Sequence, residues 1–169
     1  MKKFLVIGVV VIIIVFAIFS WIKPYTDMFK FESFPNTSEN RIQIIEDRGY
    51  TITEIYENVD TYTLTKAGLV QQYMSEWSVQ SIDPTKYVGK NIEVYRYKVK
   101  NHKLDSMGDM NETVLSLMAC NGKVIGGYSY ILNSEPLLGG VYNIDGFTLE
   151  EVTGKMYTTW VKEWMKKYQ

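Results

Sequence analysis

Residues 113–132 read TVLSLMACNGKVIGGYSYIL, two apolar runs joined by Asn121-Gly122. Asn-Gly is the preferred pair for a two-residue type I′ turn, because both of its positions adopt a positive φ. A tight turn of this kind also sets the pairing register of the strands that flank it. The stretch therefore predicts an antiparallel β-hairpin at 113–132. Its core-facing cross-strand pairs are expected to be Ala119–Val124, Leu117–Gly126 and Leu115–Tyr128.

Two adjacent glycines, Gly126 and Gly127, interrupt the second strand of this hairpin. Glycine weakens a strand interior, because it has no side chain to pack and loses much conformational freedom on folding. It is found where a strand bulges or where another element approaches the backbone closely. We therefore expect either a bulge at this point or a helix packed close against the sheet.

The rest of the chain carries helix and strand patterns on both sides of the hairpin. Apolar spacing predicts helices at 37–48, at 65–81 and from Thr148 toward the C-terminus. It also predicts at least one strand within 50–63, with a bulge or turn near Glu54, and another strand at 92–100. The order helix, strand, helix, strand, strand, strand, helix indicates an α+β domain with an antiparallel sheet.

Capping residues mark the expected helix ends. Asn36 is a suitable N-cap for the first helix, and Gly49 suits the position just after its last turn. Thr148 and Glu151 have the spacing of a capping box at the start of the last helix. These markers predict where the helices begin and end more sharply than hydrophobic spacing does.

The strand at 92–100 alternates apolar and charged residues. Its apolar side holds Tyr95, Tyr97 and Val99, and its charged side holds Arg96, Lys98 and Lys100. Strict alternation is typical of a sheet with one buried and one solvated face. We therefore expect the helices to pack on one face of the sheet.

The last helix should present one continuous apolar stripe, formed by Leu149, Val152, Met156, Trp160 and Trp164. A stripe of this length either packs on the sheet or lies in a membrane interface, since lysines are placed on the same helix. We favour packing, because the acidic domain has no net attraction to anionic lipid.

The N-terminus carries the chain's strongest apolar run. Phe4–Ile22 is uncharged, follows Lys2-Lys3, and would span about 28 Å as a helix, close to the thickness of the bilayer core. Flanking lysines tend to stay cytoplasmic, so residues 1–22 are predicted to be a single-pass transmembrane anchor, N-terminus inside, with the bilayer as partner of residues 4–22. The alternative is a signal peptide cleaved near Ser20, which would give a secreted protein.

The remaining chain divides into a juxtamembrane tether at 23–36 and an extracytoplasmic α+β domain at 37–169. The whole chain has 18 Lys and Arg against 19 Asp and Glu, a net charge of −1. Nucleic-acid binding is not expected, because phosphate contacts need clustered cations. Cys120 is the only cysteine, so an intrachain disulfide is excluded.

Candidate chemical groups are few. His102 is the only histidine and is expected to be an exposed loop residue; a Cys120–His102 nucleophile and base is the less favoured alternative. Asp105, Asp109 and Glu112 share a loop that could hold a weak calcium ion, although solvated acids are the simpler interpretation. We therefore assign no catalytic, cofactor-binding or metal-binding residues and expect no cofactor.

Several stretches between about residues 41 and 128 form a recognisable set: Arg41–Tyr50, Tyr73, Asp83, Tyr87-Val88-Gly89-Lys90, Tyr95-Arg96-Tyr97 and Asn121–Gly127. In these stretches the chain resembles an uncharacterised domain-of-unknown-function family of membrane-anchored proteins in Gram-positive bacteria. The resemblance implies a membrane-anchored domain. No activity is assigned to this family, so the resemblance implies no catalytic residues.

Two functions fit these observations. The favoured one is a non-catalytic binding or protein-interaction module at the cell envelope, whose partner is an envelope protein or the cell wall. The alternative is a cell-surface hydrolase that acts on wall or peptide material through Cys120 or loop carboxylates. Cys120 and His102 within hydrogen-bond reach in an open cleft would favour the hydrolase.

Overall fold

The structure is a computed structural model, and it describes residues 30–134 and 140–169. Phe31–Gln169 form one compact unit. None of the helices in the described ranges is both long and apolar enough to cross a bilayer. The predicted anchor at Phe4–Ile22 and the cleavage alternative at Ser20 lie outside the described residues.

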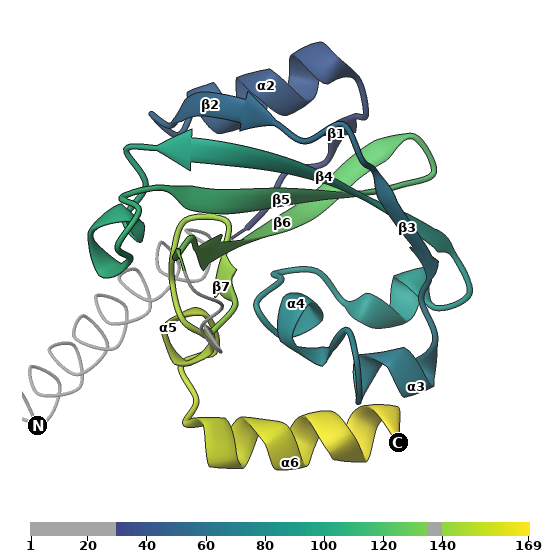
Figure 1. Cartoon of the computed structure of the whole chain (residues 1–169). Helices are drawn as coiled ribbons and strands as arrows, with labels where there is room; N and C mark the ends of the chain where they lie inside the picture. Colours follow the sequence, from purple (N-terminus) through teal and green to yellow (C-terminus); the bar gives the residue numbers. More distant parts are fainter. Residues whose placement is uncertain (1–29, 135–139) are drawn as a thin grey trace, which may run out of the picture. The chain divides into compact units, whose positions relative to one another are not determined.

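A curled antiparallel sheet forms the centre of the unit, and helices pack around it (Figure 1). The strands are β1 Phe34–Pro35, β2 Thr51–Ile55, β3 Asp60–Thr63, β4 Asn91–Lys100, β5 Thr113–Cys120, β6 Lys123–Ile131 and β7 Tyr142–Asn143. The α-helices are α2 Ser38–Glu46, α3 Lys66–Leu69, α4 Met74–Ser78, α5 Leu149–Thr153 and α6 Tyr157–Tyr168. Two 3₁₀ helices are η1 Pro84–Tyr87 and η2 Asp105–Met107. The α+β fold class is thus confirmed.

The strands follow the order β1-β6-β5-β4-β2 across the sheet. β2 and β3 both pair with the edge of β4 that faces away from β5. β2 pairs with the C-terminal half of β4, and β3 pairs with its N-terminal half. The register of β2 shifts between Ile52 and Glu54, which confirms the irregularity expected there. β3 therefore leans over one end of the sheet, where helices α3 and α4 also lie (Figure 1).

The β5–β6 hairpin has the predicted turn. Asn121 and Gly122 have φ values of 51° and 71°, as a type I′ turn requires. Ala119 pairs with Val124 as expected, but the register then shifts by one residue. The predictions Leu117–Gly126 and Leu115–Tyr128 are therefore wrong: the observed pairs are Leu117–Gly127 and Leu115–Ser129. The bulge that causes the shift inserts one extra residue into β6.

The two glycines of β6 have separate packing reasons. A Cβ atom on Gly126 would collide with Oε1 of Gln80, which follows α4. A Cβ atom on Gly127 would lie 2.8 Å from the backbone oxygen of Ser116 in β5. Both expectations for this pair, a bulge and a closely packed helical segment, are thus met at the same place.

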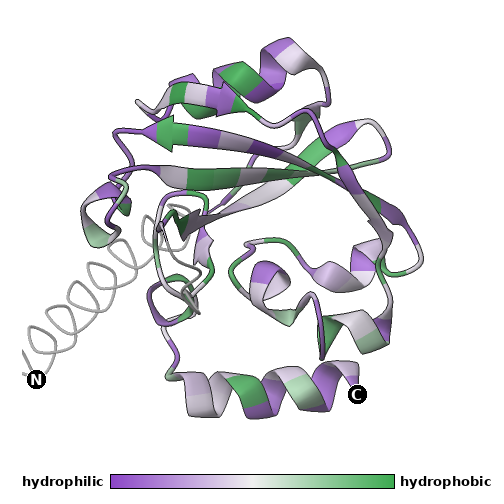
Figure 2. Cartoon of the chain, in the orientation of Figure 1, coloured by the Kyte–Doolittle hydropathy of each residue, from purple (hydrophilic) through white to green (hydrophobic). Residues whose placement is uncertain are grey.

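Helices cover both faces of the sheet, so the prediction of helices on one face only is wrong. All eight residues of β5 are buried. One face packs against α2 through a cluster that includes Ile44, Ile45, Tyr97, Leu115 and Leu117. The other face packs against α3, α4 and α6 through a cluster that includes Leu69, Trp77, Ile92, Met118 and Trp160. Figure 2 shows the hydrophobic positions that recur along the central strands.

The charged row of β4 explains this error. Arg96, Lys98 and Lys100 lie toward one end of the strand, and on the same face Ile92 and Val94 are buried under helices. The sheet is therefore covered along part of its length and solvated along the rest. The alternation of apolar and charged residues in the C-terminal half of β4 predicts which part of this sheet face is solvated. It gives no information about the part that helices cover.

Two expected helices are broken. The 65–81 segment forms α3 and α4 with a turn between them, in which the Tyr73 ring packs against Gly68 so closely that a Cβ there would lie 2.9 Å from it. The capping box of Thr148 and Glu151 is confirmed. That helix ends at Gly154, whose φ is +67°, and α6 starts anew at Tyr157.

The continuous C-terminal stripe is therefore wrong, and Met156 is 72% exposed in the junction between α5 and α6. Trp160 of α6 is only 6% exposed and belongs to the core, so α6 packs within the domain. It lies against α3 rather than directly on the sheet, as the prediction had placed it.

The domain begins earlier than expected. Phe34–Pro35 of the predicted tether at 23–36 form β1 and pair with Val124 and Lys123 of β6, so the end of that segment belongs to the sheet. Thr37, rather than Asn36, caps α2, since its hydroxyl accepts a hydrogen bond from the backbone N–H of Asn40. Gly49 follows α2 with a φ of +79°, as predicted.

Candidate ligand-binding pocket

His102 is a packing residue, and the expectation of an exposed loop histidine is wrong. It is 4% exposed, and its ring lies 4.6 Å from the ring of Tyr50. Nδ1 accepts the backbone N–H of Leu104, so Nε2 carries the proton and donates to the backbone oxygen of Ile144 at 3.1 Å. Burial lowers the pKa of His102, which keeps the ring neutral. Both ring nitrogens are thus committed to holding the loop after β4.

Cys120 lies at the opposite end of the sheet from His102. β5 runs from Thr113, which pairs with Val99 near His102, to Cys120 at the hairpin turn. Seven residues of strand separate the two ends, a distance of roughly 23 Å. Cys120 is 4% exposed, and burial raises the pKa of its thiol. The structure therefore does not bring a thiol and an imidazole together.

The loop acids between β4 and β5 have separate partners. Asp105 accepts hydrogen bonds from the backbone of His102 and from the Thr113 hydroxyl. Asp109 binds Ser134, and Glu112 accepts from Thr53. No three His, Cys, Asp or Glu side chains within the described ranges are grouped as a metal site would need. These acids order the loop and the neighbouring strands.

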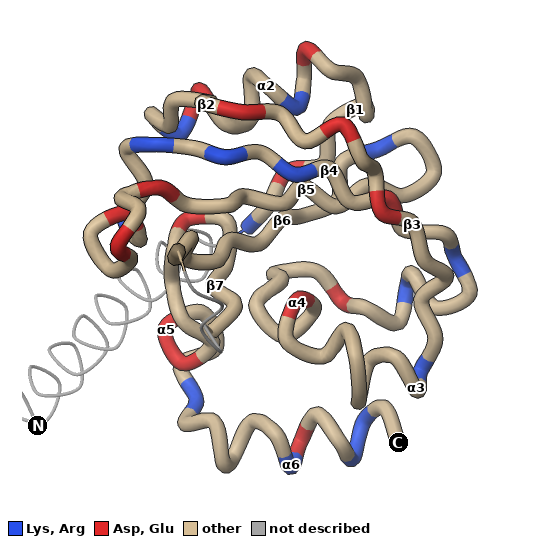
Figure 3. The backbone as a smooth tube through the Cα atoms, in the orientation of Figure 1, with Lys and Arg blue, Asp and Glu red and all other residues tan. Residues whose placement is uncertain are grey.

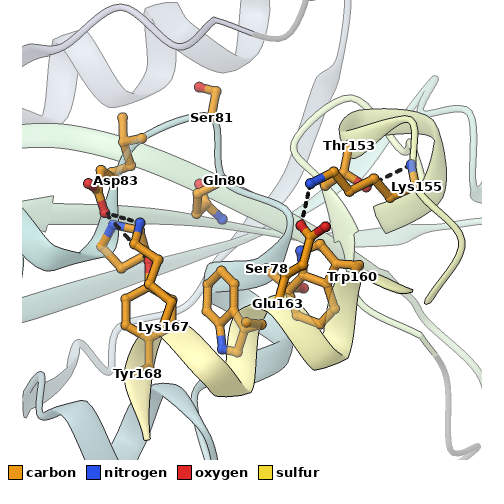
Figure 4. Close-up of a pocket in the computed structure, with 13 residues that line it drawn as sticks. Ser78, Gln80, Ser81, Asp83, Thr153, Lys155, Trp160, Glu163, Lys167 and Tyr168 are labelled. Atoms are coloured by element: carbon orange, nitrogen blue, oxygen red, sulfur yellow. Dashed lines mark hydrogen bonds and ion pairs between the residues drawn. The ribbon is translucent and has the colours of Figure 1, made fainter. Parts of the chain in front are cut away.

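Two hollows lie on the side of the sheet that holds α3, α4 and α6. The larger one, the α6 groove, has a volume of about 460 Å³ and runs between α6 and the segment that follows α4 (Figure 4). It is lined by Ser78, Gln80, Ser81, Ile82, Asp83, Pro84, Thr153, Lys155, Trp160, Glu163, Trp164, Lys167 and Tyr168. Its size and aromatic lining are features of ligand sites.

Several side chains that line the α6 groove contact or hydrogen-bond other parts of the domain. The rings of Trp160, Trp164 and Tyr168 contact one another in series along α6, in a tilted and then an edge-on arrangement, with centroids 4.8 and 4.6 Å apart. Trp164 Nε1 donates to the backbone oxygen of Leu69 at 2.7 Å, which ties α6 to α3. The hydroxyl of Ser81 accepts the backbone N–H of Phe31 at 3.0 Å. The lining is therefore held by contacts within the protein.

The charges of the α6 groove are paired as well. Lys155 binds Glu163 at one end, and Lys167 Nζ lies 3.1 Å from Asp83 Oδ1 at the other (Figure 4). Slight burial would raise the pKa of Asp83, but hydrogen bonds from Thr85 and Lys167 outweigh it, so the pKa is lowered. A ligand that used these charges would first have to break the ion pairs. The α6 groove is thus a weak candidate despite its size.

The second hollow, the Glu76 pocket, has a volume of about 280 Å³. β3, β4, β6, the turn before α4 and α4 itself contribute its lining: Asp60, Thr61, Tyr62, Tyr73, Glu76, Val94, Arg96 and Tyr128. Strand register places part of this set in one row, because Arg96, Ser116 and Tyr128 are paired side by side across β4, β5 and β6. The pocket is therefore built on the rigid centre of the sheet.

Glu76 sets this pocket apart. Oε2 of its carboxylate is buried and has no hydrogen-bond partner among the residues that the structure describes. Burial raises the pKa of Glu76, and its own backbone N–H and the charge of Arg96 offset this only in part. A buried polar atom without a partner lowers stability and is an exception in native proteins. Such an atom in a pocket is a reason to look for a ligand.

Neighbouring contacts hold Glu76 in place. Gln80, at the end of α4, donates from Nε2 to the backbone oxygens of Glu76 and Gly127, and its Oε1 accepts the N–H of Gly127. Trp77 Nε1 donates to the Tyr62 hydroxyl at 2.9 Å. The Tyr62 ring stacks on Tyr73 with centroids 3.8 Å apart. The pocket wall is therefore preorganised by hydrogen bonds and ring contacts.

The mouth of the pocket carries an ion pair. Arg96 of β4 binds Asp60 of β3, and the Asp60 side chain is 54% exposed. Figure 3 shows the row of cations on β4 beside acidic residues of β2 and β3. Burial opposes ionisation of Arg96, but its hydrogen bond to Asp60 raises its pKa. Arg96 is thus already neutralised by Asp60, whereas Glu76 is not neutralised by a close partner.

Sequence reasoning did not identify this pocket. Glu76 was one charged residue in a predicted helix, and Tyr62, Arg96 and Tyr128 belong to three separate strands. One signal was present: Glu76 follows Tyr73 by three positions, at the edge of the apolar stripe. A carboxylate at such an edge can be drawn into the core by its neighbours.

Comparison of the chain with models of protein families, with curated proteins and with solved structures found no match.

Proposed function

We propose that this chain is a membrane-tethered, non-catalytic binding domain that acts outside the cytoplasm and takes a small ligand in the Glu76 pocket. The observation that carries the proposal is the buried Oε2 of Glu76, which has no hydrogen-bond partner in the described part of the chain. An unsatisfied buried acceptor costs about 1–3 kcal/mol of stability, and a ligand that pairs with it recovers that loss.

The tether is proposed from the N-terminal sequence. The uncharged run Phe4–Ile22 after Lys2-Lys3 favours a single span with the domain outside. The bilayer is then one partner, and an envelope protein or the cell wall is another. Secretion after cleavage near Ser20 is the alternative location.

Protease added to intact protoplasts tests the orientation. Residues beyond Lys23 should be digested in intact cells, and the N-terminus of the cell-associated protein should still include residues 1–22. Digestion only after lysis would contradict the orientation, and a mature N-terminus at Trp21 would contradict the tether.

The groups that suggested a hydrolase are not arranged for catalysis. Cys120 and His102 lie at opposite ends of β5, and the loop acids bind separate partners. Nucleophilic catalysis needs the nucleophile and its base within hydrogen-bond reach. The binding function is the better proposal on these grounds.

Ligand mapping by NMR tests the binding proposal. The full chain, labelled with ¹⁵N and purified in detergent, is screened against a library of small cationic, anionic and neutral molecules. Hits should shift the amide signals of residues around the Glu76 pocket, on β3, β4, β6 and α4. Shifts confined to the α6 groove, or no saturable shift with any compound, would overturn the proposal.

A further inference from the structure

The charges that line the Glu76 pocket do not balance. Three lining residues are ionisable at neutral pH: Asp60, Glu76 and Arg96. The ion pair between Arg96 and Asp60 leaves the carboxylate of Glu76 as the uncompensated charge of the lining. Buried charges in proteins are paired or hydrogen-bonded, because removing an ion from water is costly. A cation is the ligand that restores the balance.

The remaining walls are aromatic. Tyr62, Tyr73 and Tyr128 all line the pocket, and Tyr128 is 7% exposed. Aromatic faces attract cations through their quadrupoles, most strongly where water is excluded. Carboxylate and tyrosine rings together are a suitable environment for an alkylammonium group.

We infer that the Glu76 pocket binds a small primary amine in its ammonium form, which pairs with the Glu76 carboxylate and packs against the rings of Tyr62, Tyr73 and Tyr128. This inference rests on the proposed binding function and adds the chemistry of the ligand. The volume of about 280 Å³ suits a short alkyl chain and is at the small end for drug-sized molecules.

Two other ligand classes fit less well. An anion would have to displace Asp60 from Arg96 and would meet the carboxylate of Glu76. A neutral molecule could donate a hydrogen bond to the Glu76 carboxylate, or accept one from the protonated carboxyl, but it would leave the charge of the ionised form uncompensated. A neutral probe of the same size separates this case from the ammonium ligand.

The titratable groups that face Glu76 come from each neighbouring element. They are Asp60 and Tyr62 of β3, Tyr73 before α4, Arg96 of β4 and Tyr128 of β6. Burial raises the pKa of Tyr62 and Tyr128, so these hydroxyls stay protonated at neutral pH. Burial also raises the pKa of Glu76, so its ionisation increases above the usual carboxyl range. Ammonium binding should therefore tighten from pH 5 to pH 8, since alkylamines stay charged throughout.

Calorimetric titration of the full chain in detergent tests the inference with three probes of similar size: n-butylammonium, n-butanol and butyrate. We expect saturable binding of n-butylammonium alone, and binding that is weaker by roughly tenfold or more in Glu76→Gln. Glu46→Gln is the matched control, because Glu46 is an exposed residue of α2, on the other face of the sheet. This control should bind n-butylammonium within twofold of wild type.

A second pair of variants tests the aromatic wall. Tyr128→Phe keeps the ring and should retain binding, whereas Tyr128→Leu should weaken n-butylammonium binding severalfold; circular dichroism checks that each variant is folded. Equal binding in Glu76→Gln and wild type, or affinity that falls as pH rises, would overturn the inference. Glu76-dependent binding of butanol or butyrate would overturn the ammonium ligand and leave the binding function standing. Failure of all compounds in the wider NMR screen would remove both.

Discussion

The α6 groove is lined by helices and loops, the Glu76 pocket is lined largely by strands, and the two differ in how their polar atoms are used. The groove has the greater volume, about 460 Å³ against about 280 Å³. Its charges form ion pairs and Ser81, Thr153 and Trp164 hydrogen-bond within the domain. The smaller pocket holds a buried carboxylate oxygen that no described residue pairs with. The unpaired carboxylate oxygen, rather than the larger volume, is therefore our reason for proposing the Glu76 pocket as the ligand site.

The strongest test of this comparison is Trp160→Ala. Trp160 is 6% exposed in the core, so the substitution should lower the free energy of unfolding by about 3–5 kcal/mol. If the α6 groove is structural, n-butylammonium affinity should be unchanged under conditions where the variant stays folded. Urea unfolding of the full chain measures the stability. Tyr157→Ala, at a position 52% exposed on the same helix, is the control and should change stability by less than about 0.5 kcal/mol.

Gln80→Ala tests the link between the two hollows. Gln80 lines the groove, yet its amide holds the end of α4 to Gly127 with two hydrogen bonds. Its loss should destabilise the domain by about 2 kcal/mol, because the N–H and C=O of Gly127 lose their partner. Ligand affinity should also fall, since α4 carries Glu76. Thermal unfolding and titration measure the two effects, and a loss of stability without a loss of affinity would separate Gln80 from the pocket.

Gly122→Val provides the contrasting case, at a residue that lines neither hollow. The residue adopts a φ of +71° in the type I′ turn, and a Cβ there would have open space around it. Backbone strain alone should lower stability by about 1–3 kcal/mol. Affinity at the Glu76 pocket should stay within twofold of wild type. An unchanged melting temperature would contradict the turn assignment.

Glu76→Gln should change stability in a pH-dependent way. Folding raises the pKa of Glu76, so the folded chain keeps this proton to a higher pH than the unfolded chain. Its contribution to stability is therefore present at low pH and is lost as pH rises through the folded pKa. The glutamine variant cannot ionise and should be the more stable protein at pH 8, by about 1 kcal/mol. Chemical unfolding at pH 4 and pH 8 checks this, and a gap that does not widen with pH would contradict it.

Cys120→Ser should have the smallest effect. The thiol is buried in the hydrophobic cluster that includes Trp77, Ile92 and Met118, and it lies far from His102, so we assign it no chemical activity. A hydroxyl at this position should cost about 1 kcal/mol or less in stability. Ligand affinity and any cellular phenotype of the full chain should be retained. Loss of the phenotype in a folded variant would restore the nucleophile hypothesis.

Local signals predicted much of the fold. The Asn121-Gly122 turn, the capping box at Thr148 and the glycine after α2 each depend on a few adjacent residues, and the structure has all three. The α+β class followed from the order of such elements. Predictions that needed distant contacts were wrong: helices on one face, the hairpin register past the bulge, and the unbroken helices at 65–81 and after Thr148.

The failures have a common physical cause. The close approach of Gln80 to Gly126 brings together two residues that are distant in the chain. Burial of His102 depends on Tyr50 and Ile144 in the same way. Periodicity reports which side of an element is apolar, but it does not report which element covers that side.

The sequence by itself determined the hairpin turn, the capping box at Thr148 and most of the strands, because short-range sterics and hydrogen bonds decide them. It also supplied the apolar N-terminal run on which the proposed tether rests. Only the tertiary structure decided that Glu76, Arg96 and three tyrosines from separate elements surround one pocket. Side chains that share a site are brought together by strand pairing and packing, and a lone carboxylate becomes a candidate ligand group only once its neighbours have removed it from water.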